Sequence, residues 1–207
     1  MAASQASKPR KHGSEDNGNR RADIVRAAGR LFRENGYSAT TIRDIADAVN
    51  MRSGSPFYHF KTKQEMLRAV VLEGVDGIHV AVAAAAARPL PPRERFAAMV
   101  QSHCDVLLGD EGRDFAAVLL HEARYLEEDA LAEIVRHKDE YEALWQGVLG
   151  ELKRAGLIAD DSGVTRLFLM GAMNWTSQWY RPDGKLTPRK IARQLVDFVL
   201  GPAGKGD

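Results

Sequence analysis

A group of short polar and basic side chains lies between Thr41 and Lys63. Hydroxyl groups and a histidine ring can exchange hydrogen bonds with phosphate oxygens and base edges, and arginine and lysine add positive charge. The chain contains no nucleophile elbow, phosphate-binding loop or dinucleotide motif, so this chemistry indicates binding rather than catalysis. The candidate contacts are Thr41, Ser53, Ser55, Tyr58 and His59 through hydrogen bonds, and Arg43, Arg52, Lys61 and Lys63 through charge.

The charge of the chain is distributed unevenly, although the net charge is only +1. Residues 1–63 carry twelve Lys or Arg against six Asp or Glu, whereas the rest of the chain carries 17 basic against 22 acidic residues. A basic N-terminal third on an acidic body indicates that the N-terminal end faces a polyanion such as nucleic acid.

The polar group is positioned by predicted helices. A first helix covers about residues 20–35, because its apolar residues fall on one stripe at helical spacing, and Gly36 ends it. Thr41–Asp44 has the form of a capping box and opens a short second helix. Asn50 follows this helix, and asparagine tolerates the left-handed conformation of a tight turn.

A third short helix is predicted over about residues 53–59, where Pro56 is acceptable only in the first turn. A second capping box, Thr62–Glu65, opens a long helix to about residue 87. Two short helices braced by an amphipathic one are typical of a helix-turn-helix, whose second short helix lies in a DNA major groove about 12 Å wide. The apolar residues expected in the core of this unit, without contact to DNA, are Ile42, Ile45, Val49 and Phe60.

The same segment resembles the N-terminal domain of the TetR (tetracycline-repressor) family of bacterial regulators. The matching runs are residues 24–36, 40–46, 54–60 and 63–67. The resemblance implies an all-helical homodimer with a variable C-terminal ligand domain. It also implies that six residues face DNA, with Lys63 at a helix N-terminus that can meet a phosphate: Arg43, Ser55, Phe57, Tyr58, His59 and Lys63.

The chain departs from this family pattern at three positions. Asn50 stands where the family usually has glycine, Pro56 replaces a common aliphatic residue, and Phe57 replaces a tyrosine. The missing hydroxyl at Phe57 removes one phosphate hydrogen bond, so Tyr58 and His59 are expected to carry more of the contacts.

The rest of the chain is also predicted to be helical, which makes the fold class all-α. The expected helices cover residues 93–108, 113–126, 129–155, 161–180 and 188–200. We expect a disordered basic arm over residues 1–19, a helix-turn-helix DNA-binding domain over residues 20–66, a helical effector-binding and dimerisation domain over residues 67–201, and a tail over residues 202–207.

Aromatic and methionine side chains concentrate near the end of the helix predicted over residues 161–180. They can form a dimer interface or core, because the resembled family pairs its last two helices with those of a second subunit. They can instead form the wall of a pocket for an apolar ligand. The candidate ligand-binding residues are Arg124, Phe168, Met170, Met173, Asn174, Trp175, Gln178 and Trp179.

Residues 175–191 resemble a TetR subgroup that responds to fatty-acyl or related coenzyme A thioesters. This resemblance implies an acyl-CoA-like effector, whose acyl chain enters among the helices. Basic groups such as Arg124, Arg136 or Lys138 would meet its phosphates. Another hydrophobic compound, such as a drug or an aromatic metabolite, remains an alternative.

Three other classes of protein or site are disfavoured. Cys104 is the single cysteine, which excludes an intramolecular disulfide and fits a reducing compartment. Residues 1–21 lack the apolar core of a signal peptide, and residues 80–87 are too short to cross a bilayer, so we expect a cytoplasmic protein without a membrane partner. Neither a cofactor nor a metal is expected, because these residues fit no tight ligand spacing: His103, Cys104, His121, Glu122 and His137.

The sequence thus predicts a ligand-responsive transcriptional regulator and not an enzyme. We expect a repressor that binds a palindromic double-stranded DNA operator as a homodimer and is released by a small apolar effector. Two other classes remain open: a helical-bundle enzyme or carrier without DNA binding, which would use the region of Trp175 and Trp179 as its pocket, and an architectural protein without an effector.

Overall fold

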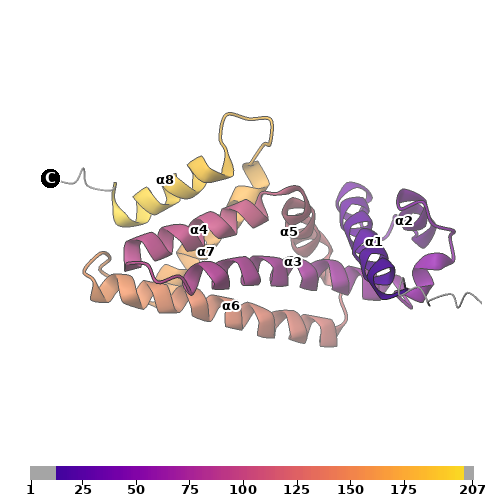
Figure 1. Ribbon diagram of the computed structural model, residues 1–207, viewed down its shortest axis with the longest axis horizontal. Coiled ribbons are helices and arrows are strands. Elements are labelled where there is room, and N and C mark those ends of the chain that lie inside the picture. Colours follow the sequence, from indigo (N-terminus) through magenta and orange to yellow (C-terminus); the bar gives the residue numbers. More distant parts are fainter. Residues whose placement is uncertain (1–12, 203–207) are drawn as a thin grey trace, which may run out of the picture.

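The computed structural model describes residues 13–202, with side chains from Arg20 onward. Within residues 13–202 the chain forms eight α-helices and two single 3-10 turns, and no strand. The all-α prediction is therefore confirmed. Figure 1 shows a small unit at one end, formed by α1 (Gly13–Asn35), α2 (Ile42–Ala48) and the turn η1 (Ser55–Tyr58), and a larger helical body.

The body is built around α3 (Lys63–Ala86), which starts in the small unit and continues between the other helices (Figure 1). It contacts α1 on one side and α4, α5 and α6 on the others. The predicted domain boundary at residues 66 and 67 thus falls inside one continuous helix. The remaining elements are α4 (Pro92–Leu107), α5 (Asp110–Glu122), η2 (Ala123–Tyr125), α6 (Glu128–Arg154), α7 (Gly163–Trp179) and α8 (Pro188–Leu200).

The first helix begins at Gly13, seven residues before the predicted start at Arg20. The helix α1 therefore includes residues 13–19 of the segment predicted as a basic arm. No apolar residue occurs between Gly13 and Arg21, so an apolar stripe could not reveal these turns. The rest of the predicted arm, residues 1–12, and residues 203–207 of the tail lie outside the described residues.

The predicted turn and cap chemistry of the small unit is largely confirmed. Gly36 and Asn50 have φ values of 82° and 54°, the left-handed conformation expected of both. Thr41 Oγ1 accepts the Asp44 N–H at 3.1 Å, and the Asp44 carboxylate accepts the Thr41 N–H at 2.8 Å. Hydrogen bonds from Thr41 hold the pKa of the Asp44 carboxyl below its ordinary value.

The cap of α3 differs from the prediction by one partner. Thr62 Oγ1 accepts the Glu65 N–H at 3.1 Å, as expected. The Glu65 carboxylate reaches one residue further back and accepts the Lys61 N–H at 2.6 Å. The start of α3 is therefore tied to the end of the segment that contains η1.

The core of the small unit is continuous with that of the body. Ile45 and Phe60 are buried and Ile42 and Val49 are partly buried against the core, as predicted. The helix α3 is long and apolar enough to span a bilayer by length and composition alone. However, it buries eight side chains against its neighbours, as the central helix of a globular bundle does.

The helices α3 and α5 approach each other closely at Gly74. A Cβ atom built on Gly74 would lie 2.1 Å from Cγ of Phe115, a separation that no side chain allows. Phe115 itself is buried. Glycine at position 74 therefore lets the Phe115 ring lie directly on the backbone of α3.

Candidate nucleic-acid interface and effector pocket

Most of the predicted DNA contacts lie on one exposed surface formed by α2, η1 and the adjoining loops. Tyr58 is 90% exposed and Phe57 is 51% exposed, which is unusual for aromatic side chains. Arg43 is exposed as well, and its Nε lies 3.8 Å from Asp47 Oδ2, a contact too loose to fix the guanidinium. The exposed members of this surface, called here the η1 surface, are Thr41, Arg43, Arg52, Ser53, Phe57, Tyr58 and Lys61.

The predicted recognition helix over residues 53–59 is a single 3-10 turn, Ser55–Tyr58. Two of its hydrogen bonds join residues three apart, Phe57 N–H to Gly54 O at 3.3 Å and His59 N–H to Pro56 O at 3.0 Å, and the Phe60 N–H also donates to Pro56 O at 3.0 Å. Pro56 explains the difference, because it has no N–H and disfavours α conformation at Ser55. Ser55 and His59 are half-buried beside this turn and reach solvent less than Tyr58 does.

The ammonium group of Lys63 does not point freely toward solvent. Its Nζ donates to the backbone oxygens of Tyr37 and Thr40, both at 2.8 Å, and lies 4.3 Å from the centroid of the Tyr37 ring. The phosphate contact stays a prediction, and in this structure two donors of the ammonium group are used by the loop between α1 and α2. Lys63 is a positioning residue that holds this loop against the start of α3.

Replacing Lys63 by methionine is expected to weaken operator binding through the position of the loop. Loss of two charge-assisted hydrogen bonds should lower the free energy of unfolding by about 1–2 kcal/mol. The dependence of operator affinity on salt should keep its slope, whereas each lost phosphate contact would reduce it by about 0.9. Binding titrations at several salt concentrations measure the slope, with Lys61→Met on the exposed η1 surface as a control that should reduce it. A reduced slope in Lys63→Met would instead indicate that Lys63 contacts a phosphate in the operator complex.

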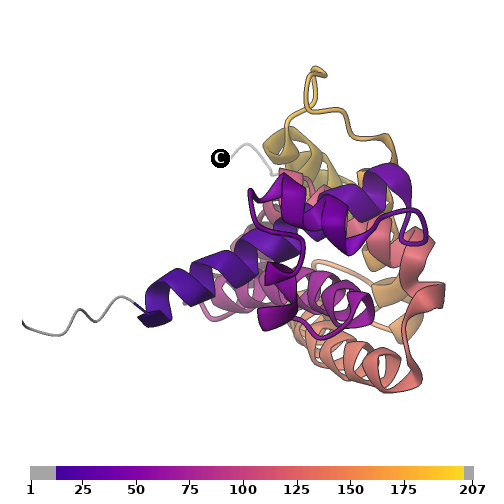
Figure 2. The ribbon, with the colours of Figure 1, turned by 90° about the vertical axis from the view of Figure 1, so that its right-hand side faces the viewer.

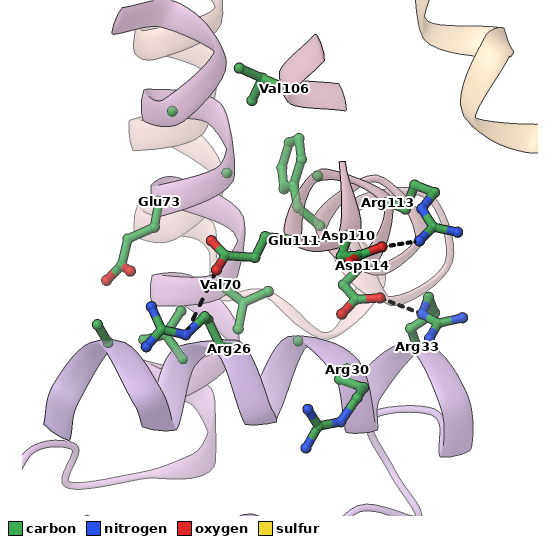
Figure 3. Close-up of a pocket in the computed structure, with 17 residues that line it drawn as sticks. Arg26, Arg30, Arg33, Val70, Glu73, Val106, Asp110, Glu111, Arg113 and Asp114 are labelled. Atoms are coloured by element: carbon green, nitrogen blue, oxygen red, sulfur yellow. Dashed lines mark hydrogen bonds and ion pairs between the residues drawn. The ribbon is translucent and has the colours of Figure 1, made fainter. Parts of the chain in front are cut away.

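The small unit is joined to the body by ion pairs between α1 and α5. Figure 3 shows Arg33 directed at Asp114 and Arg26 directed at Glu111, with the Arg26–Glu111 pair at 3.7 Å. These residues line a cleft of about 540 Å³ between α1, α3 and α5. Figure 2, seen from the end of the molecule, shows α1 crossing the ends of the body helices. A displacement of α5 would therefore act on α1 through these ion pairs.

A second cavity, called here the body pocket, occupies about 490 Å³ between α3, α4, α5, α6 and α7. Its inner part consists of buried residues, including Ile78, His103 and Tyr141. Its outer part includes the exposed residues Leu120 and Trp175. A largely apolar cavity with a few polar groups is the usual form of a small-molecule site.

Two models of known protein families match this chain. Residues 24–70 match the family described as bacterial regulatory proteins, tetR family, and residues 89–202 match the tetracyclin repressor-like C-terminal domain. The chain belongs to the TetR family. This TetR-family protein is a helix-turn-helix transcriptional regulator that binds DNA, and not an enzyme.

Individual relatives match most of the length of the TetR-family protein. It is 29% identical to the HTH-type transcriptional repressor KstR2 of Rhodococcus jostii (strain RHA1), over 87% of this chain and 89% of the relative. The crystal structure of superantigen PfiT has 38% identity and a TM-score of 0.73, over 88% of this chain and 97% of the other. The structure of AibR in complex with isovaleryl coenzyme A and operator DNA has 27% identity and a TM-score of 0.76, over 89% and 100%.

Four of the eight predicted ligand-binding residues line the body pocket of this TetR-family protein: Met170, Asn174, Trp175 and Gln178. Met173 is fully buried in the core, and Phe168 is 76% exposed, since two residues turn the helix by about 200° from Met170. Arg124 stacks on the Tyr125 ring at 4.9 Å and is not among the residues that line the pocket. Trp179 is half-exposed and also lies outside the lining.

Several pocket residues were missed by sequence reasoning. His103, Phe115 and Tyr141 lie on three different helices, so no spacing along the chain relates them. His103 was considered only as a metal ligand. Of the basic residues named for phosphate contact, Lys138 is at the pocket and pairs with Glu142 at 2.9 Å, while Arg124 and Arg136 do not line it.

Proposed function

We propose that this TetR-family protein is a repressor that binds a palindromic operator as a homodimer and leaves it when a small apolar effector enters the body pocket. The observation that carries this proposal is the body pocket itself, which lies against the same helix, α3, that positions the DNA-binding unit. The name of the KstR2 relative supports repression. The protein would act in the cytoplasm, where bacterial DNA is found.

The proposed DNA-binding surface is the η1 surface together with Ser55 and His59 at its edge. Arg43, Arg52 and Lys61 would meet phosphates, because their charge attracts the backbone without reading sequence. Tyr58 and Ser53 offer hydroxyl groups to phosphates or base edges. In a dimer the two such surfaces would contact half-sites separated by about 34–36 Å or a multiple of this distance.

The proposed dimer interface is the exposed apolar face of α7, together with α8. Phe168 is 76% exposed, Trp175 is 62% exposed and Phe198 on α8 is 85% exposed. A soluble monomer rarely leaves so many large apolar side chains on neighbouring elements in contact with water. A twofold axis would bury each face against its copy. The other exposed apolar members of this face are Val164, Leu167 and Trp179.

The proposed effector is an acyl-CoA thioester, with its acyl group in the body pocket. The AibR neighbour, which was solved with isovaleryl coenzyme A and operator DNA, supports this class of ligand. Lys138 is a charged pocket residue with an exposed side chain, where a coenzyme A phosphate could compete with Glu142 for its ammonium. Effector binding shifts operator occupancy only if the free and the DNA-bound conformations differ in their affinity for the effector.

Phe115 offers a physical link between pocket and operator. Its ring lies on Gly74 of α3 and lines both the body pocket and the cleft between α1, α3 and α5. An acyl group that displaces this ring would move α5 relative to α3 and alter the ion pairs between α5 and α1. The two DNA-binding units of a dimer would then lose the spacing of the operator.

The experiment is a gel shift with DNA from upstream of the protein's own gene, followed by titration with acyl-CoAs of increasing chain length. We expect a shifted band that is lost at micromolar acyl-CoA and is retained with free coenzyme A. The absence of a shifted band would contradict the proposal that this upstream DNA contains the operator. Release by aromatic or drug-like compounds alone would replace the acyl-CoA part of the proposal by that class of effector.

A further inference from the structure

The inner end of the body pocket carries one pair of polar side chains in apolar surroundings. His103 on α4 and Tyr141 on α6 are 1% and 7% exposed, and His103 Nδ1 lies 2.6 Å from Tyr141 Oη. The rings are stacked, with centroids 6.2 Å apart. Both residues line the pocket, and Ile78, Leu107 and other apolar groups surround them.

The hydrogen bond between these residues determines which nitrogen of the His103 imidazole carries the proton. Burial lowers the pKa of His103 to about 4, so the ring is neutral at pH 7 and carries one N–H. Among the described residues, His103 Nδ1 is the acceptor within hydrogen-bond distance of the Tyr141 hydroxyl, so we assign the Tyr141 O–H as the donor of this hydrogen bond. The imidazole proton then lies on Nε2, which is buried and has no partner among the described residues.

An N–H that is buried without an acceptor costs free energy, and the cavity beside it can hold the group that supplies one. We propose that the effector carries an uncharged oxygen acceptor, of the ketone, ester or hydroxyl class, at the end that enters the pocket first, and that this oxygen accepts the hydrogen bond of His103 Nε2. This inference rests on the proposed function, because it specifies the ligand of the same pocket. The effector would thus be polar at its buried end as well as at the mouth.

The rest of the pocket excludes two simpler ligands. A plain hydrocarbon end would leave the Nε2 proton unpaired. A carboxylate at the same place would be desolvated without a positive partner, because Lys138 is the one charged residue among the lining residues and its side chain is 59% exposed. A neutral acceptor satisfies the donor and adds no buried charge.

The test compares three probes of equal chain length without coenzyme A: 2-nonanone, 1-nonene and nonanoate. Calorimetry on the intact protein should show 2-nonanone binding roughly tenfold more tightly than 1-nonene, and nonanoate binding more weakly than either. The double variant His103→Phe/Tyr141→Phe removes both polar groups and keeps two stacked rings, so it should remain folded. Its preference for 2-nonanone should disappear while 1-nonene binds at least as well.

A matched control is Ser177→Ala, which removes a different polar group of the pocket lining and should keep the preference. The proposal is overturned if the wild-type protein binds 2-nonanone and 1-nonene equally, if the preference survives in the double variant, or if none of the three probes binds. A preference without operator release by any acyl-CoA would contradict the proposed effector and leave this inference standing. Operator release by acyl-CoAs without a preference for 2-nonanone over 1-nonene would support the proposed effector and contradict this inference.

Discussion

Replacing Tyr58 by alanine is expected to weaken operator binding about 30-fold, because a dimer loses the contact twice and each loss costs about 1 kcal/mol. The side chain is 90% exposed and no packing depends on it. The melting temperature of the free protein should therefore stay unchanged. Fluorescence anisotropy with a labelled operator measures the affinity, and differential scanning calorimetry measures the stability.

Two further variants make the Tyr58 result specific. Tyr58→Phe separates the hydroxyl group from the ring and should show part of the loss if the hydroxyl binds a phosphate or base edge. Val80→Ala shortens another highly exposed apolar side chain, on α3 and away from the η1 surface, and should bind the operator normally. Full affinity in Tyr58→Ala would mean that η1 does not face the DNA.

Replacing Phe168 by glutamate is expected to convert the proposed dimer into monomers and to reduce operator affinity more than 100-fold. A twofold interface would bring both copies of the new carboxylate into a desolvated surface, where charges without partners are costly. A monomer would then contact a single half-site. Sedimentation equilibrium measures the mass, and a gel shift measures the affinity.

The control for Phe168 is Val135→Glu, which places the same charge on an exposed apolar position of α6. This variant should remain dimeric and bind the operator. If Phe168→Glu also stays dimeric, the exposed face of α7 is not the interface. Normal melting in both variants would show that the charge acts on association and not on folding.

The parts of the fold that depend on local chemistry could be predicted from the sequence. Gly36, Thr41 and Asn50 specify their turns and cap through neighbouring backbone groups, and each was found as expected. The body helices were also found within a few residues of their predicted ends, except that α5 begins at Asp110 and gives way at Ala123 to a 3-10 turn. These features need no information about distant residues.

The features that sequence reasoning missed depend on distant contacts or on a lack of apolar residues. Lys63 was expected at a phosphate, but its ammonium is bound by backbone oxygens 23 and 26 residues away. The pair of His103 and Tyr141 joins residues 38 apart on separate helices. The polar first turns of α1 carry no stripe that could mark them.

The position of Phe115 against Gly74 matters for anyone who builds a biosensor from this regulator. Residues such as Met170 line the body pocket without lining the cleft beside α1, so exchanging them should change which compound is detected. Phe115 borders both cavities, so exchanging it would alter the size of the response together with its selectivity. Libraries that keep residues 74 and 115 fixed would therefore explore new ligands with an unchanged output.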